Sequence, residues 1–170
     1  MKSTLLTLLL LWSTLTLAQR NPLADQFSCA SKAIMLDGPE VTRKAMTDVT
    51  SLMCECQPFA FGTNLIVYLE EADNVSVTTV FSFNEGKCCR TSIRIAYVAG
   101  DDGRDERAAQ LTRYFKDLYG DKVNATQAPA YYSLHSPIRS HAWVGAHSYL
   151  QMDVMDERSK SMIEVTRIYK

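Results

Sequence analysis

The chain has 170 residues, 18 of them Lys or Arg and 19 Asp or Glu, which gives a formal net charge of −1 at pH 7. This length suits one ordinary domain, large enough to bury a core without a disulfide scaffold or a metal. The near-neutral balance argues against nucleic acid or an anionic membrane surface as the main partner, because both select concentrated Lys and Arg.

Residues 1–18 have the pattern of a secretory signal peptide. Lys2 gives a basic start, residues 5–12 are apolar apart from one Thr, and small residues lead up to Ala18. An apolar run this short is typical of a cleaved signal rather than of a membrane span. We therefore expect cleavage after Ala18, a single domain over residues 19–170 with no transmembrane segment, and a secreted or periplasmic location.

Two helices are predicted at the start of this domain. Asn21 and Pro22 suit the cap and the first position of one helix, and residues 37–39 would end it and begin the next. Apolar residues recur at three- and four-residue steps and predict the buried faces: Leu23, Phe27, Ala30 and Ile34 in the first helix, and Val41, Ala45, Val49, Leu52 and Cys56 in the second.

Three strands follow. Residues 64–69 form a short apolar run, and residues 75–83 and 88–97 alternate with the two-residue period of half-buried strands. Between the last two strands, a two-residue loop at residues 85–86 would pair Phe83 with Cys88 and Phe81 with Arg90. That register mixes apolar and charged side chains on one face.

A three-residue loop at residues 84–86 avoids this mixing. It pairs Phe81 with Cys89 and Val77 with Ile93, with Gly86 in the left-handed position. We expect this loop, which buries Cys89 and leaves Cys88 on the other face.

A third helix and three more strands are predicted in the remainder. Asp101 or Asp102 would cap the helix and Gly120 would end it, with a buried stripe of Ala108, Leu111, Phe115 and Leu118. The strands are expected at residues 141–146, 148–155 and 161–169. This order, ααβββαβββ, predicts the α+β class: an antiparallel sheet of about six strands with the helices packed on one face.

The five cysteines, Cys29, Cys54, Cys56, Cys88 and Cys89, are all disulfide candidates in an exported chain, and an odd number leaves at least one thiol unpaired or shared with a partner. We expect a disulfide from the 54/56 pair to the 88/89 pair. The alternative is a four-thiolate metal site, as in a thiol-based metal carrier. Because Cys-x-Cys holds tetrahedral zinc less well than Cys-x-x-Cys, we expect no bound metal or other cofactor.

Three histidines carry the enzymatic alternative. His135, His141 and His147 are spaced by six and could join a carboxylate such as Asp153 in the site of a secreted hydrolase. Any such site needs these side chains to converge in space. No recognised catalytic motif surrounds them, so the sequence favours binding over catalysis.

Aromatic residues in the last third suggest the surface for that binding. Tyr131, Tyr132, Trp143 and Tyr149 could form a binding face, since Tyr and Trp carry much of the energy of protein contacts. Asn74 and Asn124 each begin an acceptor pattern for N-glycosylation. We therefore expect a small exported protein that binds a protein or a small ligand, such as an inhibitor, an immunity-type protein or an accessory module.

Overall fold

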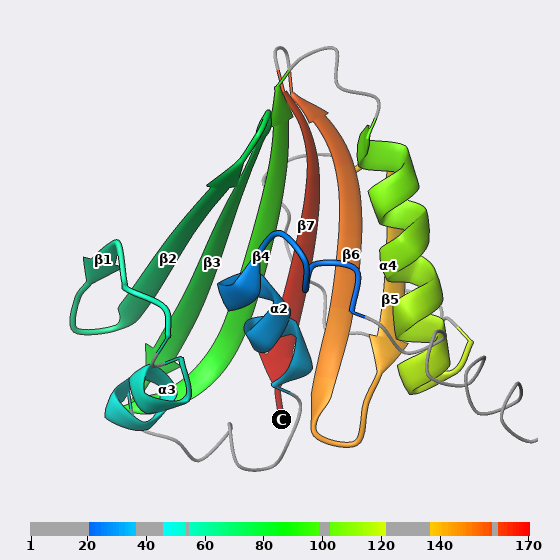
Figure 1. Ribbon diagram of the computed structural model, residues 1–170. Helices are drawn as coiled ribbons and strands as arrows, with labels where there is room; N and C mark the ends of the chain where they lie inside the picture. Colours follow the sequence, from blue (N-terminus) through cyan, green and yellow to red (C-terminus); the bar gives the residue numbers. More distant parts are fainter. Residues whose placement is uncertain (1–20, 37–45, 54, 99–102, 122–136, 158–159) are drawn as a thin grey trace, which may run out of the picture.

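One antiparallel sheet dominates the computed structural model, which describes residues 21–36, 46–53, 55–98, 103–121, 137–157 and 160–170 (Figure 1). The sheet confirms the α+β class and has seven strands in the order β1-β2-β3-β4-β7-β6-β5. In chain order these are β1 (Ala60–Phe61), β2 (Leu65–Ala72), β3 (Val75–Asn84), β4 (Lys87–Val98), β5 (Arg139–Val144), β6 (Ser148–Glu157) and β7 (Lys160–Tyr169). The strand beyond the expected six is β1, whose two residues are too few to show a period.

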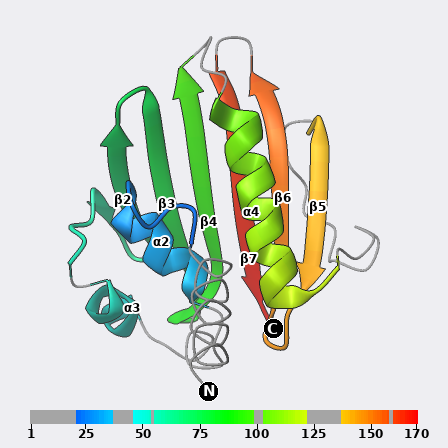
Figure 2. The same cartoon turned by 45° about the vertical axis from the view of Figure 1, so that its right-hand side comes forward.

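The helices of the described residues lie on one face of the sheet, as expected (Figures 1 and 2). They are α2 (Ser28–Met35), α3 (Met46–Leu52) and α4 (Gly103–Tyr119). Because strand side chains alternate between faces, Val77, Thr79, Phe81 and Phe83 of β3 all turn toward the helices and are buried. None of the described helices is both long enough and apolar enough to cross a membrane.

The first helix begins later than predicted. The side-chain amide of Asn21 accepts a hydrogen bond from the Leu23 N–H (3.0 Å) and donates one to the Ser31 carbonyl (2.9 Å). Residues 22–26 form turns. The helix N-terminus is capped instead from the sheet. Glu70 of β2 accepts hydrogen bonds from the backbone N–H groups of Cys29 (2.8 Å) and Ala30 (2.9 Å). A carboxylate at this end also complements the helix dipole.

The β3–β4 hairpin corrects the predicted loop. Glu85 (φ 51°) and Gly86 (φ 76°) are both left-handed, as in the two-residue type I′ turn that suits strand twist. Phe83 pairs with Cys88, and the register then shifts so that Ser82 pairs with Arg90. Cys89 is therefore the extra residue of a β-bulge.

This bulge reverses the expected positions of the two cysteines. Cys88 is buried, with 2% of its surface exposed, whereas Cys89 is only partly buried. Beyond the bulge Phe81 pairs with Thr91 and Val77 with Ile95. The apolar set thus stays on the helix side despite the short turn.

The prediction of buried helix residues is also wrong at two positions. Leu52 is 39% exposed and Leu118 is 47% exposed, so both lie at the edge of the buried face or outside it. Met53 and Tyr114 are buried in the same regions. Gly120 does end α4, with a φ of 81° and its N–H bonded to the Lys116 carbonyl (2.8 Å). Residues 1–18, 37–45, Asp101 and Asp102 lie outside the described residues.

Candidate functional site

The disulfide differs from the predicted pairing. Cys56 is bonded to Cys29, with 5.8 Å between their Cα atoms, which ties α2 to the segment after α3. Cys88 and Cys89 keep their thiols, and Cys54 lies outside the described residues. The expected bond from the 54/56 pair to the 88/89 pair is therefore wrong, because Cys56 bonds to Cys29 and both Cys88 and Cys89 are free. A disulfide of this kind is compatible with an extracellular location.

Burial raises the pKa of the Cys88 thiol to about 11. The thiol is thus protonated at neutral pH and is a poor metal ligand or nucleophile. Within the described part of the chain, no three side chains of His, Cys, Asp and Glu gather as a metal site would require.

The histidine site is not assembled by the described residues. His141 pairs with Met152, and its ring lies 6.2 Å from that of Trp143 on the helix side of the sheet. Asp153 pairs with Ser140, which precedes His141 in β5, so the Asp153 side chain turns to the opposite face of the sheet. His147 lies in the exposed β5–β6 turn. His135 is outside the described residues.

The expected aromatic face is also divided. Trp143 has no exposed surface and packs against Phe115 of α4, with 5.1 Å between ring centroids, so it is a core residue rather than part of a binding face. Tyr149 is half-buried under the Lys170 ammonium, which lies 4.6 Å from its ring centroid. Tyr131, Tyr132 and Asn124 lie outside the described residues.

A different surface emerges on the face opposite the helices. Over β2, β3 and β4 its side chains are exposed or half-buried, whereas over β6 and β7 the same face is buried at Met155, Met162 and Thr166. The uncovered part contains a recess of about 260 Å³. It is lined by Thr78, Val80, Ser82, Arg90, Ser92, Arg94 and Glu164, and we call it the arginine recess.

Two arginines of β4 converge on one carboxylate in this recess. Nη2 of Arg94 lies 3.5 Å from Oε1 of Glu164, and Nη2 of Arg90 lies 4.0 Å from the same oxygen. Ser92, between the arginines, donates a hydrogen bond of 2.8 Å to that oxygen. These contacts follow from the pairing of Arg94 with Glu164 in the sheet and from the strand period, which puts residues 90, 92 and 94 on one face.

The charged side chains of the arginine recess differ in how much of their surface is exposed. The Arg94 side chain is 49% exposed and that of Arg90 30%, but that of Glu164 only 8%. The next strand adds Asp153, which is also buried and accepts hydrogen bonds from Ser140 (2.6 Å) and Gln151 (2.8 Å). The arginine guanidinium groups are therefore accessible to solvent, whereas the carboxylates of Glu164 and Asp153 are buried.

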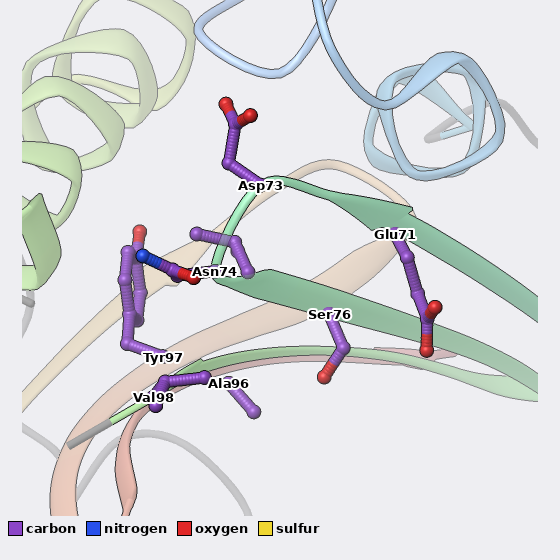
Figure 3. A pocket seen from close by; sticks show the side chains of 8 residues that line it. Glu71, Asp73, Asn74, Ser76, Ala96, Tyr97 and Val98 are labelled. Carbon is purple, nitrogen blue, oxygen red and sulfur yellow. The ribbon is translucent and has the colours of Figure 1, made fainter.

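Two other recesses contrast with this one. At the tip of the β2–β3 hairpin, an open recess of about 270 Å³ lies beside Glu71, Asp73, Asn74 and Tyr97, and the carboxylates of Glu71 and Asp73 point apart (Figure 3). On the helix side, a groove of about 340 Å³ runs between α4 and β5. It is lined by Ala108, Ala109, Thr112, Arg113, Arg139, His141 and Val154, and we call it the α4–β5 groove.

Comparison with family models, with curated proteins and with solved structures found no match to this chain. The arginine recess was also missed by reasoning from the sequence. Its one local signal is the pair Arg90 and Arg94, which share the polar face of a predicted strand. Glu164 lies 70 residues beyond Arg94 in the sequence, so only the pairing of β4 with β7 brings them together.

Proposed function

We propose that the protein is an exported binding protein whose arginine recess holds an acidic segment of a protein partner. The observation that carries this proposal is the convergence of Arg90 and Arg94 on the single oxygen Oε1 of Glu164. The Arg94 side chain is 49% exposed and that of Arg90 30%, so a second carboxylate can approach the two guanidinium groups from solvent. Arginine forms charge-assisted hydrogen bonds with carboxylates and often does so in a bidentate manner.

The surroundings of the recess support a protein partner. Leu65 and Leu69 of β2 are 46% and 42% exposed, on the same face as the arginines. Arginine is enriched at protein interfaces, and the centre of an interface is more apolar than the rest of the surface. A recess of about 260 Å³ is also smaller than the roughly 300–1,000 Å³ of small-molecule pockets, and it suits one or two acidic side chains.

The α4–β5 groove favours a second candidate function, the binding of a small anionic ligand. Its volume of about 340 Å³ falls just within the small-molecule range, and its floor includes Ala108 and Val154. Arg113 and Arg139 stand at its rim, but Arg139 already pairs with Asp105. The groove and the arginine recess therefore each combine two arginines with one carboxylate, and the exposed Leu65 and Leu69 beside the recess favour it as the site for a protein partner.

A selection experiment tests the proposal without a known partner. Random peptides displayed on a library are selected on the folded protein and on an Arg90→Gln/Arg94→Gln variant, and the composition of the enriched peptides is compared. We expect peptides enriched in Asp and Glu on the wild-type protein. Their affinity should fall at least tenfold, about 1.4 kcal/mol, for the double variant, and it should weaken as salt is added.

Arg113→Gln is the matched control, because it removes an exposed arginine from the helix side of the molecule. It should leave the affinity of the selected peptides unchanged. Enriched peptides without acidic residues would refute the proposal, as would peptides that bind the double variant equally well. A loss confined to Arg113→Gln would instead support the α4–β5 groove.

A further inference from the structure

The tip of the β2–β3 hairpin combines an acceptor sequence with an exposed position. We propose that Asn74 carries an N-linked oligosaccharide in the exported protein. Asn74, Val75 and Ser76 have the Asn-x-Ser acceptor spacing. This inference rests on the export that is part of the proposed function, but it does not depend on the arginine recess.

Asn74 can carry a bulky group without disturbing the fold. It is exposed in the turn between β2 and β3, and its backbone is held by a 3.1 Å hydrogen bond from the Val98 N–H to its carbonyl. The exposed side chain lines the open recess at the hairpin tip (Figure 3). A sugar chain attached there would extend into solvent.

The other described asparagines lack this combination. Asn21 is buried, with 8% of its surface exposed. Asn64 and Asn84 are exposed, but Ile66 and Gly86 stand where an acceptor needs Ser or Thr. Among the described residues, Asn74 alone therefore has both the acceptor spacing and the exposure.

The modification is a group transfer from a lipid diphosphate-linked oligosaccharide. Nδ2 of Asn74 attacks C1 of the sugar at the reducing end, and an N–C1 bond forms. The bond between C1 and the phosphate oxygen breaks, and the lipid diphosphate leaves with that electron pair. The proton lost from the amide nitrogen goes to a base of the transferase, and nothing is oxidised or reduced.

The glycan would stand beside the arginine recess rather than on it. Thr78, which pairs with Arg94, lies four residues along β3 from Asn74, about 13 Å at the rise of an extended strand. A partner could therefore occupy the recess while the hairpin tip carries the sugar. Enzymatic removal of the glycan should leave the affinity of acidic peptides unchanged.

Translation of the full chain in the presence of endoplasmic-reticulum microsomes tests the inference. An Asn124→Gln chain leaves Asn74 as the remaining acceptor sequence. Protease protection reports translocation, and a gel shift that an endoglycosidase reverses reports the glycan. We expect a single shift for Asn124→Gln and for Asn124→Gln/Ser76→Thr. The shift should be lost from Asn124→Gln/Asn74→Gln and from Asn124→Gln/Ser76→Ala.

The outcomes separate this inference from the proposed function. A protected Asn124→Gln chain without a shift would overturn the glycan at Asn74 and leave export standing. A chain that the protease digests completely would overturn both export and the glycan. A shift that persists in the Asn74→Gln chain would place the sugar at another residue and refute the inference.

Discussion

Arginine is used differently on the two faces of the sheet. On the helix side Arg167 is 3% exposed and donates hydrogen bonds to the Leu36 carbonyl (2.7 Å) and the Tyr119 hydroxyl (2.8 Å). It thereby joins the end of α2, the last turn of α4 and strand β7. On the opposite face Arg90 and Arg94 share one carboxylate and remain partly exposed. A charge enclosed by the fold serves stability, whereas a charge at the surface can serve a partner.

The largest effect should come from the core on the helix side. Trp143 has no exposed surface, so Trp143→Ala should lower the free energy of unfolding by about 3–5 kcal/mol through lost burial and a new cavity. Phe61 is 58% exposed, and Phe61→Ala should change stability by about 0.5 kcal/mol or less. Urea denaturation measures both. Equal losses would show that the helices do not enclose the core as described.

The disulfide should contribute almost as much. Cys29 and Cys56 are 27 residues apart, and a loop of this size predicts a loss of roughly 3–4 kcal/mol in Cys29→Ala/Cys56→Ala. Cys89→Ala, which removes a partly buried thiol, is the control and should cost much less. Peptide mapping of the unreduced protein must find Cys29 linked to Cys56. Alkylation of Cys29 in that protein would contradict the bond.

The enclosed arginine should show a smaller, coupled effect. Tyr119→Phe removes one acceptor of Arg167 and should cost about 1–3 kcal/mol, because a buried charged donor loses one of its hydrogen-bond partners. In an Arg167→Met background the same change should cost close to nothing. On the other face, Arg94→Gln should stay within about 0.5 kcal/mol of the wild-type stability. If the stability losses of Tyr119→Phe and Arg167→Met simply added in the double variant, the two residues would not be coupled. The arginine on the helix side would then not differ from those on the opposite face.

The effect that is smallest at neutral pH concerns two neighbouring thiols. Burial raises the pKa of Cys88 from its ordinary value of 9.0 to about 11, so the folded state holds this proton more tightly than the unfolded state. The free energy of unfolding should therefore fall as pH rises from about 9 to 11, relative to a Cys88→Ala variant. Iodoacetamide at neutral pH should modify the less buried Cys89 first. Faster labelling of Cys88 would contradict the bulge.

Local patterns in the sequence predicted the helix-facing side better than the surface. The alternation of residues 75–83 placed Phe81 and Val77 in the core, and Gly120 marked the end of α4. Contacts between distant residues were not accessible in this way. Glu70 caps a helix 40 residues earlier, and Glu164 meets Arg94 only through the pairing of β4 with β7. The bulge at Cys89 was not predicted either. Without a bulge, a two-residue turn would mix apolar and charged side chains on one face, so the sequence pattern favoured a three-residue loop. The bulge lets the two-residue turn keep the apolar residues on one face.

We propose that partners bind the uncovered face through Arg90 and Arg94. Nuclear magnetic resonance titration with an acidic peptide from the selection tests it most directly, because it reports backbone amides and arginine side chains together. We predict shifts at the Nε–H groups of Arg90 and Arg94 and along β3 and β4, with little change in α4. Shifts confined to the α4–β5 groove, around Arg113 and His141, would contradict the account.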